Sequence, residues 1–225
     1  MKRFFAGLTA GGMLAITISA ASAATIHETA IIGTTGLSSG SAISSGSYLG
    51  SQFELSQTTK ITGIGGHMFA AHGNMFGAIV SLDPGLMKPS FLPSELEANT
   101  LAHTVFNAGL PSADYIAPIS VVLGPGNYAV IFGSGLFGSS GLGGMPGNNT
   151  PIAGTSFFAS GGFGVIDGTH VWHDAQTDPN LRFVVEGVSR VPLPPALSLF
   201  ASALIGGGVI AWRRRRKQKA EPLAA

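Results

Sequence analysis

The apolar residues between positions 24 and 190 occur in short runs, and none of these runs has the spacing of a convincing amphipathic helix. The runs are rich in β-branched and aromatic residues, and clusters of Gly, Pro, Asn and Ser separate them. This pattern predicts an all-β domain, an antiparallel β-sandwich of jelly-roll-like type. The nine predicted strands comprise residues 25–32, 47–55, 60–69, 76–82, 100–106, 116–123, 127–132, 155–158 and 181–186.

Turns and loops separate these strands. Asp83-Pro84-Gly85 and Gly124-Pro125-Gly126 combine a proline, which presets φ, with a glycine that tolerates positive φ. A short helix could start near Ser94, which can act as a cap, and we interpret the surrounding residues 87–98 as a loop insert. Two Gly-rich stretches, residues 33–46 and 133–149, are predicted to be flexible loops or wide connections outside the core.

The charge distribution limits the partners of this domain. Residues 24–190 contain four basic and ten acidic side chains and therefore carry a net charge of −6, while the other eight basic residues lie at the two ends of the chain. A domain so poor in cations cannot neutralise a phosphate backbone, so nucleic acid is not expected as a partner. The absence of cysteine excludes disulfides and thiolate metal sites.

Residues 1–23 have the organisation of a signal peptide. Lys2 and Arg3 precede an apolar stretch, and Ala21-Ser22-Ala23 has the small-x-small pattern that signal peptidase accepts. We expect cleavage after Ala23. The alternative is an N-terminal membrane anchor, for which the apolar run is short.

Residues 191–219 form a three-part tail. A proline-rich motif is followed by an uncharged segment, residues 196–212, which is long enough to cross a membrane as a helix, and then by a basic cluster, residues 213–219. The prolines keep the motif out of helix, and the basic side chains favour the cytoplasmic side of the inner membrane. The motif consists of Val191, Pro192, Leu193, Pro194 and Pro195, and the cluster is centred on Arg213, Arg214, Arg215, Arg216 and Lys217.

This tail resembles the PEP-CTERM sorting signal of Gram-negative bacteria, in which Val-Pro-Glu-Pro is the usual motif. Leu193 stands where the family most often has glutamate, as in the Val-Pro-Leu-Pro variant. The resemblance implies recognition by an exosortase, cleavage near Pro192 to Pro194, and release or transfer to the cell surface. Residues 60–67, 124–133 and 182–187 also resemble segments of PEP-CTERM proteins, and this second resemblance implies no activity. The alternative is a plain C-terminal anchor.

Several residues within the domain are candidates for metal sites. His67 with His72, or His170 with His173 and Asp174, could supply metal ligands, although their spacing is a weak signal. Oxygen-rich loops of extracytoplasmic modules bind calcium, and the carboxylates that fit this description are Asp167, Asp174 and Asp178. The competing interpretation is that these side chains serve solubility and local turns.

No catalytic set is evident. Gly36-Leu37-Ser38-Ser39-Gly40 matches a nucleophile elbow, but the pattern predicts no helix after it. Most aromatic residues are predicted to pack in the core, and Trp172 is the best candidate for an exposed sugar-stacking ring. We therefore expect no enzyme and no resident cofactor, but an exported surface or extracellular-matrix protein that the PEP-CTERM resemblance associates with exopolysaccharide or biofilm. The alternatives are a carbohydrate- or calcium-binding module and, third, an extracytoplasmic hydrolase.

Overall fold

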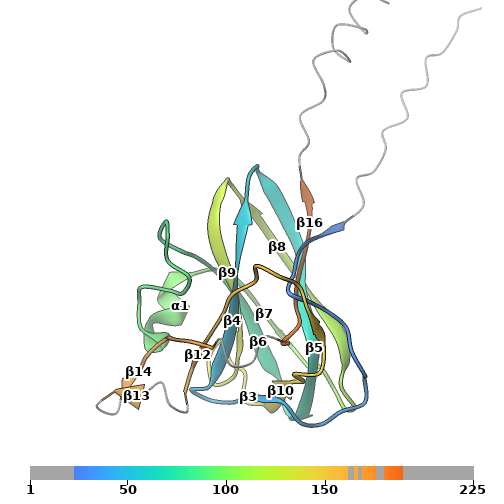
Figure 1. Cartoon of the computed structure of the whole chain (residues 1–225). Helices are drawn as coiled ribbons and strands as arrows, with labels where there is room; N and C mark the ends of the chain where they lie inside the picture. The colour runs from blue at the N-terminus through green and yellow to red at the C-terminus, as the bar shows by residue number, and fades with distance from the viewer. Residues whose placement is uncertain (1–22, 162–164, 167–168, 176–179, 190–225) are drawn as a thin grey trace, which may run out of the picture.

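The structure is a computed structural model that describes residues 23–161, 165–166, 169–175 and 180–189 (Figure 1). Nearly all of its regular structure is antiparallel β, so the all-β prediction is confirmed. The helical residues in the described ranges are the 3-10 turn η1 (Pro93–Glu95) and the single turn α1 (Leu96–Asn99). Apart from Ala23, the predicted signal peptide and sorting tail lie outside the described residues. Within those ranges, no helix has the length and hydropathy that a membrane span requires.

Two main sheets make up the domain. The long strand β5 is central to the first sheet, because β16 pairs along one edge of its N-terminal half and β8 along the other. The first sheet contains β1 (Ala24–Glu28), β16 (Phe183–Ser189), β5 (Thr59–His72), β8 (Ala113–Leu123), β10 (Leu142–Met145) and β3 (Ser41–Ile43). The second sheet has the order β15 (His173–Asp174), β12 (Phe157–Ser160), β4 (Tyr48–Leu55), β9 (Gly126–Gly133), β6 (Met75–Ser81) and β7 (Thr100–Phe106). Two short antiparallel pairs, β2 (Ala30–Ile31) with β11 (Thr150–Pro151) and β13 (Val165–Ile166) with β14 (Thr169–His170), complete the described strands.

The second sheet is buried on both faces. Along β4 and β9, Leu49, Phe53 and Phe132 face the first sheet, where the ring of Phe132 stacks on Phe183 of β16. The alternate residues, such as Tyr48 and Ile131, face a second apolar cluster that the segment around α1 helps to cover. Because side chains of a strand alternate between its faces, this double burial explains why β6 and β9 contain continuous apolar runs. The arrangement is β-sandwich-like, with an additional layer outside the second sheet (Figure 1).

The two Gly-rich stretches are not merely flexible loops, and that prediction was wrong. They contain β3 and β10, which pair with each other, and both Ile43 and Met145 are fully buried. Glycine lets the backbone of β10 come close to that of β5, because a Cβ on Gly143 would lie 2.1 Å from the Phe69 carbonyl oxygen. The helix that could start near Ser94 is a single turn, and the Glu95 carboxylate caps the 3-10 turn before it by accepting from the Leu92 N–H at 2.9 Å.

Candidate functional site

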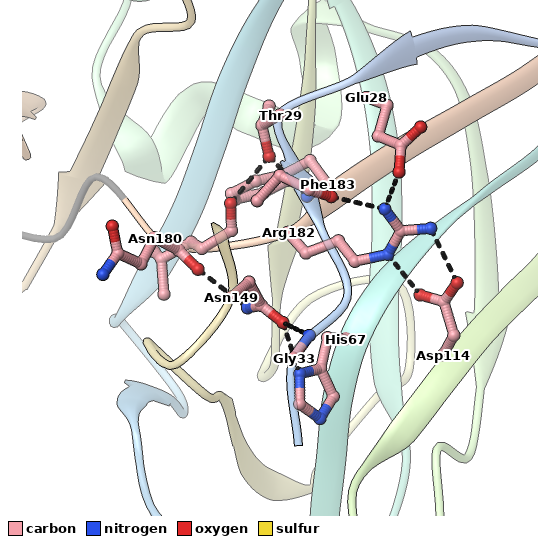
Figure 2. A network of polar contacts seen from close by, with 11 residues as sticks. Glu28, Thr29, Gly33, His67, Asp114, Asn149, Asn180, Arg182 and Phe183 are labelled. Carbon is pink, nitrogen blue, oxygen red and sulfur yellow. Dashed lines mark hydrogen bonds and ion pairs between the residues drawn. The ribbon is translucent and has the colours of Figure 1, made fainter. Parts of the chain in front are cut away.

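A charged network lies where the chain enters β16. Arg182 is 9% exposed, and its guanidinium donates to both oxygens of Asp114 on β8, from Nε at 3.0 Å and from Nη2 at 2.9 Å. Its Nη1 donates to the Glu28 carboxylate on β1 and to the Ala30 carbonyl (Figure 2). One buried cation thus joins the chain at β16 to β1, β8 and β2.

A second polar network surrounds His67 on β5. The Asn149 amide nitrogen donates to the Pro146 carbonyl at 2.8 Å and to the Asn180 carbonyl at 2.7 Å. These two bonds fix the amide oxygen toward His67, as Figure 2 shows. That oxygen lies 2.7 Å from His67 Nδ1, so Nδ1 carries the proton. The other ring nitrogen, Nε2, lies 2.9 Å from Ser112 Oγ, and it accepts from that hydroxyl when Nδ1 carries the single ring proton.

The order Ser112, His67, Asn149 has the connectivity of a nucleophile, a base and an orienting group. However, these side chains are respectively 1%, 0% and 3% exposed, so a substrate carbonyl cannot reach the serine oxygen in this structure. The network instead fastens loops: Asn149 Oδ1 also accepts from the Gly33 N–H, and the Ser112 main chain bonds to Gly36 and Leu37. Both ring nitrogens of His67 are occupied, while His72 is exposed at the end of β5, so the structure does not bring them together as metal ligands.

A cleft of about 400 Å³ opens at the edge of the sandwich beside His27 of β1. Its walls are part of β4 and two loops, and its lining residues are His27, Gln52, Phe53, Glu54, Gly85, Leu86, Met87, Ala153, Gly154, Thr155 and Ser156. β12 pairs with β4 only at residues 48–51, so the cleft lies where the paired part of this strand edge ends.

The His27 ring is held in one orientation and one protonation state. It stacks on Phe53 with 5.9 Å between centroids, and its Nε2 lies 3.2 Å from Ser51 Oγ. The Ser51 hydroxyl donates to the Ser156 carbonyl at 3.1 Å, so its oxygen accepts from His27 Nε2–H and leaves Nδ1 as the acceptor nitrogen. Burial lowers the pKa of His27 to about 4, against a smaller opposing effect of Glu28, so the ring is neutral at pH 7.

A second cleft, of about 530 Å³, lies on the outer side of the second sheet. It is lined by Ser45, Gly46, Tyr48, Pro93, Ser94, Gly135, Leu136, Thr169 and His170. Trp172 is near this region but is 7% exposed, and its ring packs edge-on against Phe158 at 5.3 Å. The prediction of an exposed stacking ring was wrong, because Trp172 covers the outer face of the second sheet.

Of the three carboxylates predicted to bind calcium, Asp174 is the one that the structure describes. Asp174 is exposed and forms an ion pair with Lys88 at 3.3 Å, whereas Asp167 and Asp178 lie outside the described residues. His170 and His173 lie on different short strands, β14 and β15. No group of three His, Cys, Asp or Glu side chains suited to a metal ion occurs in the part of the chain that the structure describes.

Most of the predicted sorting residues lie outside the part of the chain that the structure describes. Ala23 is described and exposed, whereas Ala21, the motif at residues 191–195 and the basic cluster at residues 213–219 lie outside the described residues. Sequence reasoning missed Ser112 and Asn149, because their partner His67 is 45 and 82 residues away and no local motif marks them.

Comparison of the chain with protein-family models, with curated proteins and with solved structures finds no match.

Proposed function

We propose that the chain is an exported, non-enzymatic surface or extracellular-matrix protein associated with exopolysaccharide or biofilm. Signal peptidase removes residues 1–23, and the helix at residues 196–212 holds the protein transiently in the inner membrane. An exosortase then processes the motif at residues 191–195, and the jelly-roll-like domain reaches the cell surface or the medium. Nucleic acid has no part in this scheme, and no cofactor is needed.

The observation that carries the proposal is the order of the tail: a proline motif, an uncharged span and a basic cluster. The limits of the strands support it. β1 begins at Ala24, the residue after the predicted signal-peptide cleavage site, and β16 ends at Ser189, two residues before Val191. Removing both processing segments would therefore leave every described strand intact.

Mass spectrometry of the mature protein from the native cell envelope and medium tests this directly, because it reads both termini. We expect a chain that starts near Ala24 and ends before Ala196. A protein that keeps its tail through Arg216 would instead be an ordinary anchored domain, and exosortase processing would be rejected.

Variants of the motif sharpen the test. Pro192→Ala combined with Pro194→Ala should leave the tail uncleaved, while the signal peptide is still removed. Leu193→Glu creates the usual form of the motif and should still be processed, so it is the matched control for a change within the same five residues. Cleavage of both variants at the same place would show that the motif is not read.

A carbohydrate-binding module is the second candidate function. The cleft beside His27 favours it, because it is concave and combines apolar side chains with a few polar groups. Calcium binding has weaker support, because the carboxylate of Asp174 is paired with Lys88.

A further inference from the structure

The cleft beside His27 presents polar groups on one wall and apolar groups on another. Gln52 and Glu54 are two residues apart on β4 and therefore project from the same face of the strand. The loop that follows β6 supplies Leu86 and Met87, which are 41% and 48% exposed. Side chains that are this exposed retain apolar area that a ligand could cover.

The polar wall can both donate and accept hydrogen bonds. The Gln52 amide oxygen is 3.5 Å from the Ser156 hydroxyl, which leaves the amide N–H groups as donors. The Glu54 carboxylate is exposed and only accepts, and Thr155 adds a hydroxyl. A saccharide unit matches this combination, because its hydroxyls donate and accept while its ring C–H faces are apolar.

Charge narrows the class of saccharide. Among the described residues that line the cleft, Glu54 is the acidic one and none is Lys or Arg, while the low pKa of His27 keeps its ring neutral at pH 7. Two of the basic residues of the domain are already engaged, Arg182 with Asp114 and Lys88 with Asp174. An anionic sugar would meet a carboxylate with no lining cation to balance it, so the cleft disfavours uronates and sulfated sugars.

His27 and Phe53, which line the cleft, are held in place by contacts within the protein. The stack of His27 on Phe53 continues to Tyr128, whose ring is 5.8 Å from that of Phe53. The chain of hydrogen bonds from His27 through Ser51 to the Ser156 carbonyl ties β1, β4 and the loop before β12 together. The strand side of the site is therefore held in place before a ligand arrives, which reduces the entropy that binding costs.

We infer that this cleft binds a neutral or amino-substituted saccharide unit, through Gln52 and Glu54 on one wall and Leu86 and Met87 on the other. The inference rests on the proposed function, since an exported protein meets the extracellular polysaccharide that would supply such a unit. It adds to that function both the place of contact and the charge class of the polymer.

Affinity electrophoresis of the mature protein, purified from its native envelope, tests the inference in gels that contain dextran, chitosan oligosaccharide or alginate. We expect dextran or chitosan oligosaccharide, but not alginate, to retard the protein. The double variant Gln52→Ala, Glu54→Ala should bind about tenfold more weakly. Met87→Ala tests the apolar wall separately and should also weaken binding. Gln57→Ala is the matched control, because Gln57 is five residues from Gln52 and does not line the cleft.

The other outcomes overturn the inference in different ways. Retardation by alginate alone would show that the cleft prefers an anionic sugar and would reject the neutral or amino-substituted saccharide. Equal retardation of the double variant and the Gln57→Ala control would place binding elsewhere on the protein. Failure of all three probes to retard a protein with correctly processed termini would reject the saccharide site and leave the proposed export and sorting untouched.

Discussion

The Arg182 guanidinium donates hydrogen bonds to both carboxylate oxygens of Asp114, at 3.0 Å and 2.9 Å, although the two residues are 68 positions apart in the sequence. The same guanidinium reaches the Glu28 carboxylate on β1, so one cation lies between two anions from different strands. Bidentate pairs of this kind are stronger and more directional than single contacts between charges. The network therefore secures β1, an edge strand, to the centre of the first sheet.

Asp114→Asn should lower the free energy of unfolding by about 2 kcal/mol, because it leaves the Arg182 charge with one anionic partner in a mostly buried setting. Arg182→Lys should also destabilise the protein, since an ammonium cannot reproduce the planar fork. Urea unfolding at pH 7 measures both changes. Lys88→Ala is the control: its ion pair with Asp174 has side chains 38% and 58% exposed, so its removal should change stability by less than about 1 kcal/mol. Equal effects at the two pairs would contradict this explanation.

Asn149→Ala should destabilise the domain by about 3 kcal/mol, because the His67 ring, the Gly33 N–H and the carbonyls of Pro146 and Asn180 all lose a partner in the interior. Asn148→Ala changes the same residue type one position earlier, where the side chain is exposed and makes one hydrogen bond, to Thr34. Its effect should stay below about 1 kcal/mol. Thermal unfolding followed by near-UV circular dichroism compares the two variants directly. Similar melting temperatures would mean that the amide network contributes little.

Stability should decrease as the pH falls below about 6.5. The pKa of His27 is about 4 in the folded protein and near 6.5 when the ring is in solvent, so the unfolded chain takes up a proton first. The contribution of the neutral His27 ring to the free energy of unfolding is fully present above pH 6.5 and is lost as the pH falls toward 4. The total loss is on the order of 3 kcal/mol. Urea midpoints between pH 7 and pH 5 measure the slope before most carboxylates titrate. His27→Gln should flatten that slope, whereas the exposed-site variant His72→Gln should retain it. An unchanged slope in His27→Gln would show that other groups cause the dependence.

Gly65→Ala should destabilise the domain by about 3 kcal/mol, because its Cβ would lie 1.8 Å from the Tyr115 carbonyl oxygen on the neighbouring strand β8. The backbone at that point cannot move aside without disturbing the β5–β8 pairing. Gly124→Ala is the matched control, since nothing lies within 4 Å of the corresponding Cβ position. Denaturant midpoints of the two variants should differ clearly, and coincident midpoints would refute the close-approach explanation.

The positions of several strands could be predicted from local sequence. β7 has the predicted bounds, and β4, β6 and β9 begin within one residue of them, because their apolar runs end at strong turn residues. β3 and β10 could not be predicted, since glycines that permit close strand contact look the same in sequence as glycines of a flexible loop. Arg182 could have been singled out as one of four basic residues in an acidic domain. Ser112 and the cleft beside His27 could not, because segments far apart in the sequence create both.

Ala24 pairs with Gly187, so the described chain enters and leaves the domain at the same end of the first sheet (Figure 1). β5 runs from Thr59, opposite Ser189, to His72 beside β10, a length of about 40 Å. If either terminus were tethered to a surface, that end of the first sheet would lie next to the surface and the opposite end would point away from it. The turn after His72 and the β3–β10 pair would form the distal cap, and that cap would be the first part of the molecule to meet anything approaching from outside.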